Sequence, residues 1–158
     1  MEPDLQKLKS WIYKCIHETS QNTSPEIEEF TDDFLKEIQC IFKYYLKAFN
    51  EIKQETNIDS SKDFLKHSIF IYKLSETKGF MLFKTNFKLI FSSIKPGQIR
   101  IKFLKQKILG EVEILTDTYL NLFYNDMMPV RWIHENKKGF VDKNILVRYY
   151  MKRFIQEK

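Results

Sequence analysis

Apolar residues recur at steps of three or four over residues 24–57, which predicts one long amphipathic α-helix. The stripe consists of Ile27, Phe30, Phe34, Ile38, Ile41, Tyr45, Ala48 and Ile52. Thr23 and Ser24 precede Pro25, an order typical of a helix start, because the hydroxyls can accept from free amides and proline has no amide to leave unpaired. At 1.5 Å per residue the helix would be about 50 Å long, so it needs a covering surface along its length.

Two interpretations of this covering surface stay open. In the first, the chain's own remaining elements cover the stripe, and the helix belongs to the core. In the second, the stripe is the seam of a coiled coil or a dimer, although it is wider than a strict heptad seam. The residues that would then contact a partner are Phe34, Ile38, Ile41 and Tyr45.

A shorter helix is predicted over residues 4–18 from the spacing of Leu5, Leu8, Ile12, Cys15 and Ile16. The polar residues 18–24 have the length of a connection between antiparallel helices, so we expect a helical hairpin. The cap-type residues after Asn57 mark a boundary. Residues 1–60 would form the hairpin and residues 64–158 a second unit, with one integrated domain as the alternative.

From His67 onward the apolar period changes to two, which is typical of strands. Strands are predicted over residues 68–74, 80–91 and 98–104, and the residues between them, 76–79 and 95–97, have turn chemistry. This order predicts an antiparallel meander or a small barrel.

The remaining third of the chain is less uniform. Residues 110–124 fit a helix or strands, and we favour strands with a turn near Asp117. We expect a loop over 125–129, a strand over 130–134, a turn over 135–138 and a return strand over 139–141. A wide apolar stripe after Asp142 predicts a C-terminal helix capped by that residue. The predicted fold class is therefore α+β.

A set of residues in this third also has the order of a known barrel. Gly110-Glu-Val-Glu-Ile-Leu is followed by Arg131-Trp132-Ile133, a polar turn and Gly139-Phe140-Val141. Residues 110–146 thereby resemble the second half of a bacterial Src-homology-three-like barrel. The resemblance implies that residues 145–150 form a last strand and that Trp132 faces a ligand, with a core position for Trp132 as the alternative. The family's proline and tyrosine would fall on Asp142 and Ile145, which argues against a groove for proline-rich peptides.

Charge is distributed unevenly along the chain. The net charge of +5 combines −4 over residues 1–66 with +9 over residues 67–158. Between Ile69 and Lys107 nine basic residues stand against one acid, so this region attracts anions. The alternation of side chains places several cations on one solvated face of the strands. Lysines at such positions also protect strand edges from pairing with other chains. The candidate residues for binding an anionic partner are Lys84, Lys88, Arg100, Lys102, Lys105 and Lys107.

The sequence lacks the motifs of common catalytic and cofactor sites. Its four glycines are too scattered for a dinucleotide-binding turn or a phosphate loop. It has no CxxC pair, and His134-Glu135 is not followed by the second histidine of a zinc-protease helix. We therefore expect no enzymatic activity, no cofactor and no metal.

Length and composition fit a globular protein inside the cell. The chain has 158 residues, of which 43% are apolar, enough for one core. No apolar run approaches the length of a membrane span, and the first residues lack the pattern of a signal peptide. These features predict an intracellular protein, located in the cytoplasm.

Two functions fit these observations. The first is a protein-interaction module, an adaptor or complex subunit, whose long helix and basic sheet face contact a protein partner or a second copy. The second is binding of single-stranded nucleic acid, with lysines on phosphates and aromatic rings on bases. Lysines supply charge without base recognition, which weakens the second hypothesis.

Overall fold

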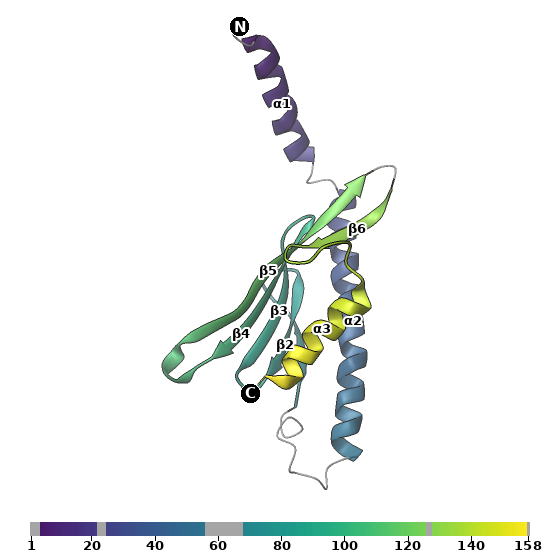
Figure 1. Ribbon diagram of the computed structural model, residues 1–158, viewed down its shortest axis with the longest axis vertical. Coiled ribbons are helices and arrows are strands. Elements are labelled where there is room, and N and C mark those ends of the chain that lie inside the picture. Colours follow the sequence, from purple (N-terminus) through teal and green to yellow (C-terminus); the bar gives the residue numbers. More distant parts are fainter. Residues whose placement is uncertain (1–3, 22–24, 56–67, 126–127, 158) are drawn as a thin grey trace.

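The computed structural model describes residues 4–21, 25–55, 68–125 and 128–157. Two helices, α1 (Leu5–Gln21) and α2 (Pro25–Glu55), precede an antiparallel sheet, and a third helix, α3 (Lys143–Gln156), follows it (Figure 1). The α+β fold class is therefore confirmed. The capping residues Thr23 and Ser24 proposed for the long helix lie outside the described residues.

The sheet is a meander of six strands whose order in space is their order in the chain. The strands are β1 (Phe70–Lys73), β2 (Gly79–Lys84), β3 (Phe87–Lys95), β4 (Gln98–Gln106), β5 (Val112–Asn125) and β6 (Met128–His134), with a 3₁₀ turn at Ile108–Gly110. The sheet is open, with β1 and β6 at its edges. Of the two predicted sheet arrangements, the antiparallel meander is confirmed and the closed small barrel is not formed.

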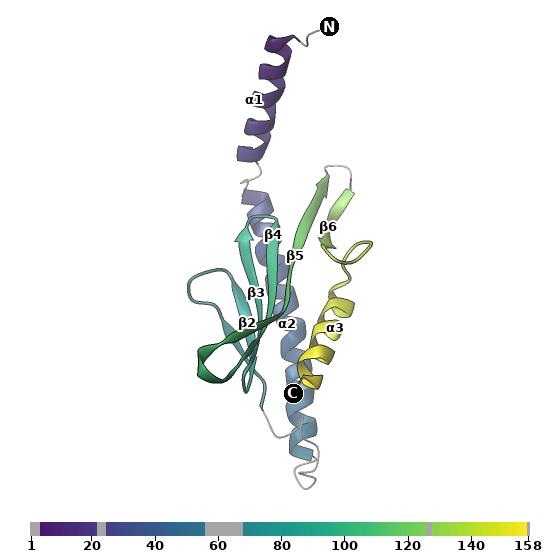
Figure 2. The same cartoon turned by 60° about the vertical axis from the view of Figure 1, so that its left-hand side comes forward.

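Helices α2 and α3 pack on one face of the sheet, and this layer contains the core (Figures 1 and 2). Phe42 of α2 lies against Phe80 and Phe91, and Tyr150 of α3 meets Phe91 edge-on, with ring centroids 5.4 to 5.7 Å apart. Burial of these large apolar side chains is the main favourable term in folding. One core thus joins α2, the sheet and α3.

This packing decides between the two interpretations of the long stripe. Phe34 and Ile38 are buried in the protein's own core, and Ile41 and Tyr45 are partly buried beside it. The core interpretation is confirmed. Phe34 and Ile38 are therefore covered by the protein's own elements, whereas Ile41 and Tyr45 remain partly exposed.

The predicted helical hairpin is wrong. Helix α1 extends away from α2 instead of folding back along it (Figures 1 and 2). Trp11 and Ile12, on its apolar side, are 65% and 50% exposed. The sheet and α3 occupy the apolar stripe of α2, so α2 has no second apolar face for α1 to cover.

Two strand boundaries also differ from the sequence expectation. Residues 80–91 form two strands joined at Thr85 and Asn86, where Lys84 pairs with Phe87 and Thr85 has a φ of 53°. Residues 112–125 form one strand with no turn near Asp117, which pairs with Lys102. On its β4 side β5 instead has a bulge opposite Phe103 and Leu104, and on its β6 side the register shifts between Phe123 and Asn125.

The C-terminal helix is confirmed, including its cap. The side chain of Asp142 accepts from the Ile145 N–H at 3.0 Å. Residues 145–150 are helical and not the last strand that the barrel resemblance implied. The expected return strand over 139–141 is reduced to one bridge between Ile133 and Phe140, and the loop over 125–129 is shorter because β5 ends at Asn125 and β6 begins at Met128.

Candidate functional site

The face of the sheet opposite α2 and α3, which we term the outer face, has no helix of the described residues packed on it (Figure 2). Side chains alternate along each strand, so the register determines which residues share this face. One row across five strands consists of Phe70, Phe83, Lys88, Leu104 and Ile114, and the next of Tyr72, Met81, Ile90, Lys102 and Asp117. Arg100 and Tyr119 pair in a third row.

Apolar side chains dominate the outer face. Phe70 and Tyr72 are 50% and 51% exposed, and their rings are stacked with centroids 6.3 Å apart. Met81, Phe83 and Ile90 are partly exposed beside them. A contiguous apolar patch of this kind on a protein surface is typical of an interaction site.

Lys84, the first of the predicted anion-binding residues, is not on this face. It is only 4% exposed, and its ammonium group donates to the backbone carbonyls of Phe154, Ile155 and Glu157 at 2.8 to 3.2 Å. The last carbonyls of a helix have no partner within the helix, and they carry partial negative charge. Lys84 therefore caps α3. Its assignment to an anion site was wrong.

Two further predicted cations already have carboxylate partners. Arg100 forms a two-pronged ion pair with Asp117, with N···O distances of 2.8 and 2.6 Å. The hydrogen bonds from Arg100 lower the pKa of Asp117, and the same bonds raise the pKa of Arg100. Lys107 lies 3.3 Å from Glu113. These two ion pairs reduce the positive electrostatic field around strands β4 and β5.

The other three predicted cations lie at different places on the sheet. Lys88 and Lys102 stand on the outer face, in the two apolar rows. The Lys105 ammonium lies 5.5 Å from the centroid of the Phe87 ring. The structure thus brings together Lys88, Lys102 and the Arg100–Asp117 pair around apolar side chains, and it does not form a cluster of six cations.

Trp132 is a core residue. It is buried, and its ring centroid lies 4.6 Å from that of Phe34 on α2. Contact with α2 places it on the inner side of the sheet. The alternative of a ligand-facing aromatic at this position is wrong.

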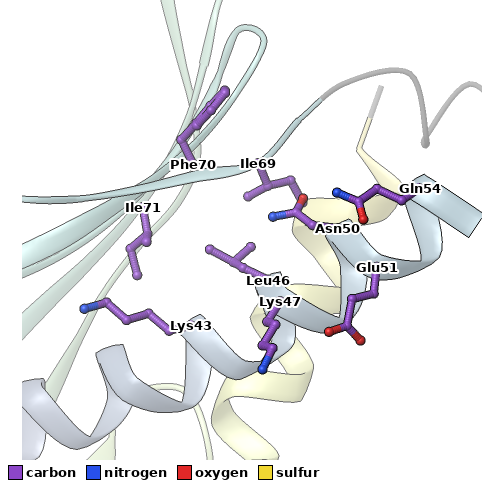
Figure 3. Close-up of a pocket in the computed structure, with 9 residues that line it drawn as sticks. All are labelled: Lys43, Leu46, Lys47, Asn50, Glu51, Gln54, Ile69, Phe70 and Ile71. Carbon is purple, nitrogen blue, oxygen red and sulfur yellow. The ribbon is translucent and has the colours of Figure 1, made fainter.

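A groove runs between the edge strand β1 and the C-terminal half of α2 (Figure 3). It is open and has a volume of about 560 Å³. Leu46 of α2 and Ile71 of β1 point toward one another across it, whereas Phe70 points to the other side of the strand. Lys43, Lys47 and Glu51 supply the charged groups of its lining. No pattern in the sequence indicates this groove, because it depends on how α2 crosses the sheet.

His134 and Tyr150 form a buried polar pair that sequence reasoning missed. The Asn136 N–H donates to His134 Nδ1 at 3.1 Å, so Nδ1 carries no proton and Nε2–H donates to the Tyr150 hydroxyl at 2.9 Å. Burial is the main cause that lowers the pKa of His134, and burial raises the pKa of Tyr150. Both side chains are neutral, and they tie β6 to α3.

This pair predicts a pH dependence of stability. The pKa of His134 in the folded protein lies below its ordinary value of about 6.5, so the unfolded chain binds more protons as the pH falls below that value. The free energy of unfolding should therefore decrease from pH 7.5 to pH 5.5. Urea titrations at both values should show a larger decrease for the wild type than for His134→Gln. An equal decrease in both proteins would show that His134 does not titrate in this way.

The described residues show no sign of a metal centre or a membrane span. They contain no cluster of three or more histidine, cysteine, aspartate or glutamate side chains suited to a metal ion. Among the same residues, no helix combines the length and apolar character that crossing a bilayer requires. No protein-family model, curated protein or solved structure matches this chain.

Proposed function

We propose that this chain is a non-catalytic protein-binding module, an adaptor or complex subunit, whose partner docks on the outer face of the sheet. One observation supports the proposal above all: within the ranges that the structure describes, helices cover one face of the sheet, and the other face carries partly exposed Phe, Tyr, Met and Ile side chains. Burial of such a patch against a partner is favourable, and aromatic residues, Met and Arg are enriched at protein interfaces.

The charges on this face indicate the chemistry of the partner. Lys88 and Lys102 lie within the apolar rows, and Asp117 neutralises Arg100. A complementary partner would therefore present an apolar centre with carboxylates around it. The exposed side of α2 is a weaker candidate, because its apolar stripe is buried in the core.

A second candidate function is binding of single-stranded nucleic acid on the same face. The stacked rings of Phe70 and Tyr72 favour it, since bases stack on such platforms beside cations. The buried position of Lys84 and the ion pairs of Arg100 and Lys107 count against it. These interactions leave fewer cations for phosphate contacts.

A photo-crosslinking experiment tests the protein-binding proposal. The crosslinking amino acid p-benzoylphenylalanine replaces Ile114 on the outer face or, as a control, Tyr44 on the solvent side of α2, both of which are exposed. In cells, the substitution at position 114 should give an adduct with a defined protein, and the one at position 44 should not. The purified partner should then bind Ile114→Asp at least tenfold more weakly than wild type or Tyr44→Asp.

The same proteins separate the two candidate functions. A labelled single-stranded oligonucleotide is titrated over a range of salt concentrations by fluorescence anisotropy. Nucleic-acid binding would give a linear fall of log affinity with log salt, with a slope that drops by about 1.4 when Lys88 and Lys102 are both replaced by alanine. That result, together with no adduct at position 114, would replace the protein-binding proposal with the nucleic-acid one.

A further inference from the structure

We infer that the edge of β1 that faces away from β2, with the groove beside α2, binds an extended acidic segment of a partner protein, which adds a seventh strand to the sheet. The inference rests on the proposed protein-binding function, and it specifies the conformation and charge of a segment of the partner. The site is separate from the centre of the outer face, because its backbone contacts lie at the edge of the sheet.

The backbone of β1 has hydrogen-bonding groups that point away from β2. The Leu74 N–H donates to the Gly79 carbonyl at 3.1 Å. Bonded and non-bonded pairs alternate along an antiparallel ladder, and the register continues from this pair through Tyr72 with Met81 to Phe70 with Phe83. The N–H and C=O groups of Ile71 and Lys73 therefore face the open edge, where an added strand would pair with them.

The two edges of the sheet differ in this respect. At β6 the Val141 N–H donates to the Trp132 carbonyl at 2.7 Å, and Phe140 forms a bridge with Ile133. The chain thus covers that edge itself at Trp132 and Ile133. In the part of the chain that the structure describes, β2 is the one strand that pairs with β1. No proline or bulge interrupts β1, so its edge retains the form that accepts another strand.

The groove would receive alternate side chains of the added strand. Successive side chains of a strand point to opposite faces. Those on the inner side would enter the groove beside Leu46 and Ile71 (Figure 3). Those on the other side would extend the outer face next to Phe70 and Tyr72. Strand addition of this kind obtains affinity from main-chain bonds and specificity from alternate side chains.

Charge favours an acidic occupant. Lys43 and Lys47 lie one helical turn apart on α2 and line the groove, against one carboxylate, Glu51. Lys73 stands on β1 itself. Pairing of β1 with the β1 of a second copy would bring these lysines of both copies to one edge, where like charges repel. A partner segment with carboxylates meets no such repulsion.

A binding measurement with designed peptides tests the inference on the full-length protein. The probe is a fluorescein-labelled peptide of seven residues that alternates valine and glutamate. Its anisotropy should rise to saturation with the protein. A peptide with lysine in place of glutamate should bind at least tenfold more weakly. A probe N-methylated at alternate residues, on the edge that pairs with β1, should lose binding, because its main-chain donors are removed.

Variants of the protein locate the binding site. Lys73→Pro removes one N–H from the open edge and leaves the ladder to β2 intact, so it should weaken binding at least tenfold with little change in melting temperature. Lys43→Glu combined with Lys47→Glu should have a similar effect. Lys36→Glu, on an exposed position of α2 outside the groove, is the matched control and should bind as the wild type does.

Each contrary outcome has a defined meaning. Absence of binding by the acidic probe, or equal binding of its N-methylated form, would overturn strand addition even if Lys73→Pro failed to fold. If the wild type formed a dimer and Lys73→Pro dissociated it, the occupant of the edge would be a second copy, and the proposal of an acidic partner segment would be overturned. If the probe failed while the crosslinked partner still bound the outer face, the inference would fail and the proposed function would stand. If both the peptide-binding and the crosslinking experiments failed, the strand-addition inference and the protein-binding proposal would both be rejected.

Discussion

Replacement of Ile38 by aspartate is expected to unfold the protein. Ile38 is fully buried on the side of α2 that packs against the sheet, and it belongs to the core cluster. A carboxylate at this position would lose its hydration without gaining a partner, and the core would lose a large apolar side chain. We expect a loss of at least about 4 kcal/mol from the free energy of unfolding, a large part of the total stability of a small domain. Circular dichroism during urea titration measures this loss.

Tyr44→Asp is the matched control for this variant. Tyr44 lies on the same helix but is 70% exposed, so its replacement should change the free energy of unfolding by no more than about 0.5 kcal/mol. If Ile38→Asp were as stable as Tyr44→Asp, and had the same mass in solution as the wild type, Ile38 could not be a core residue.

Replacement of Lys84 by methionine should also be strongly destabilising. Methionine keeps much of the apolar length of the side chain but cannot donate to the carbonyls of Phe154, Ile155 and Glu157. Because these hydrogen bonds involve a charged donor at a helix C-terminus, we expect a loss of about 2 to 4 kcal/mol. Thermal and urea unfolding both measure it.

Lys88→Met controls for the general loss of a lysine from the sheet. Lys88 is four residues further along the chain and on the outer face, where its replacement should alter stability by no more than about 0.5 kcal/mol. Equal stability of the two variants would mean that Lys84 does not hold the end of α3.

The periodic parts of the fold could be predicted from the sequence because their burial follows local spacing. Ile38 belongs to a stripe with helical spacing, and Asp142 precedes a second stripe as a cap. The turn at Thr85 was missed because it contains no glycine or proline, and apolar residues continue on both sides of it. The orientation of α1 was predicted wrongly because the length of its connection to α2 is compatible with several orientations. The spacing of residues also does not show that the sheet, and not α1, covers the apolar stripe of α2.

The candidate site was less accessible to sequence reasoning, for a related reason. Alternation does place Lys88, Arg100 and Lys102 on one face, as the register shows. The partners of individual cations depend on distant segments: Lys84 meets the end of α3, and Arg100 meets Asp117, where the sequence favoured a turn. The groove beside β1 likewise arises only when α2 and the sheet are packed together.

Amide hydrogen exchange of the native protein is the most direct test of whether the sheet covers α2 while α1 extends away from this core. Amides from Phe34 to Phe49 should exchange only through global unfolding, because these turns lie beneath the sheet. Amides of α1 should exchange close to the rate of an unstructured peptide, because Trp11 and Ile12 on its apolar side are exposed and an isolated helix of 17 residues is marginal in water. Rapid exchange throughout α2, or protection of α1 equal to that of α2, would contradict this arrangement.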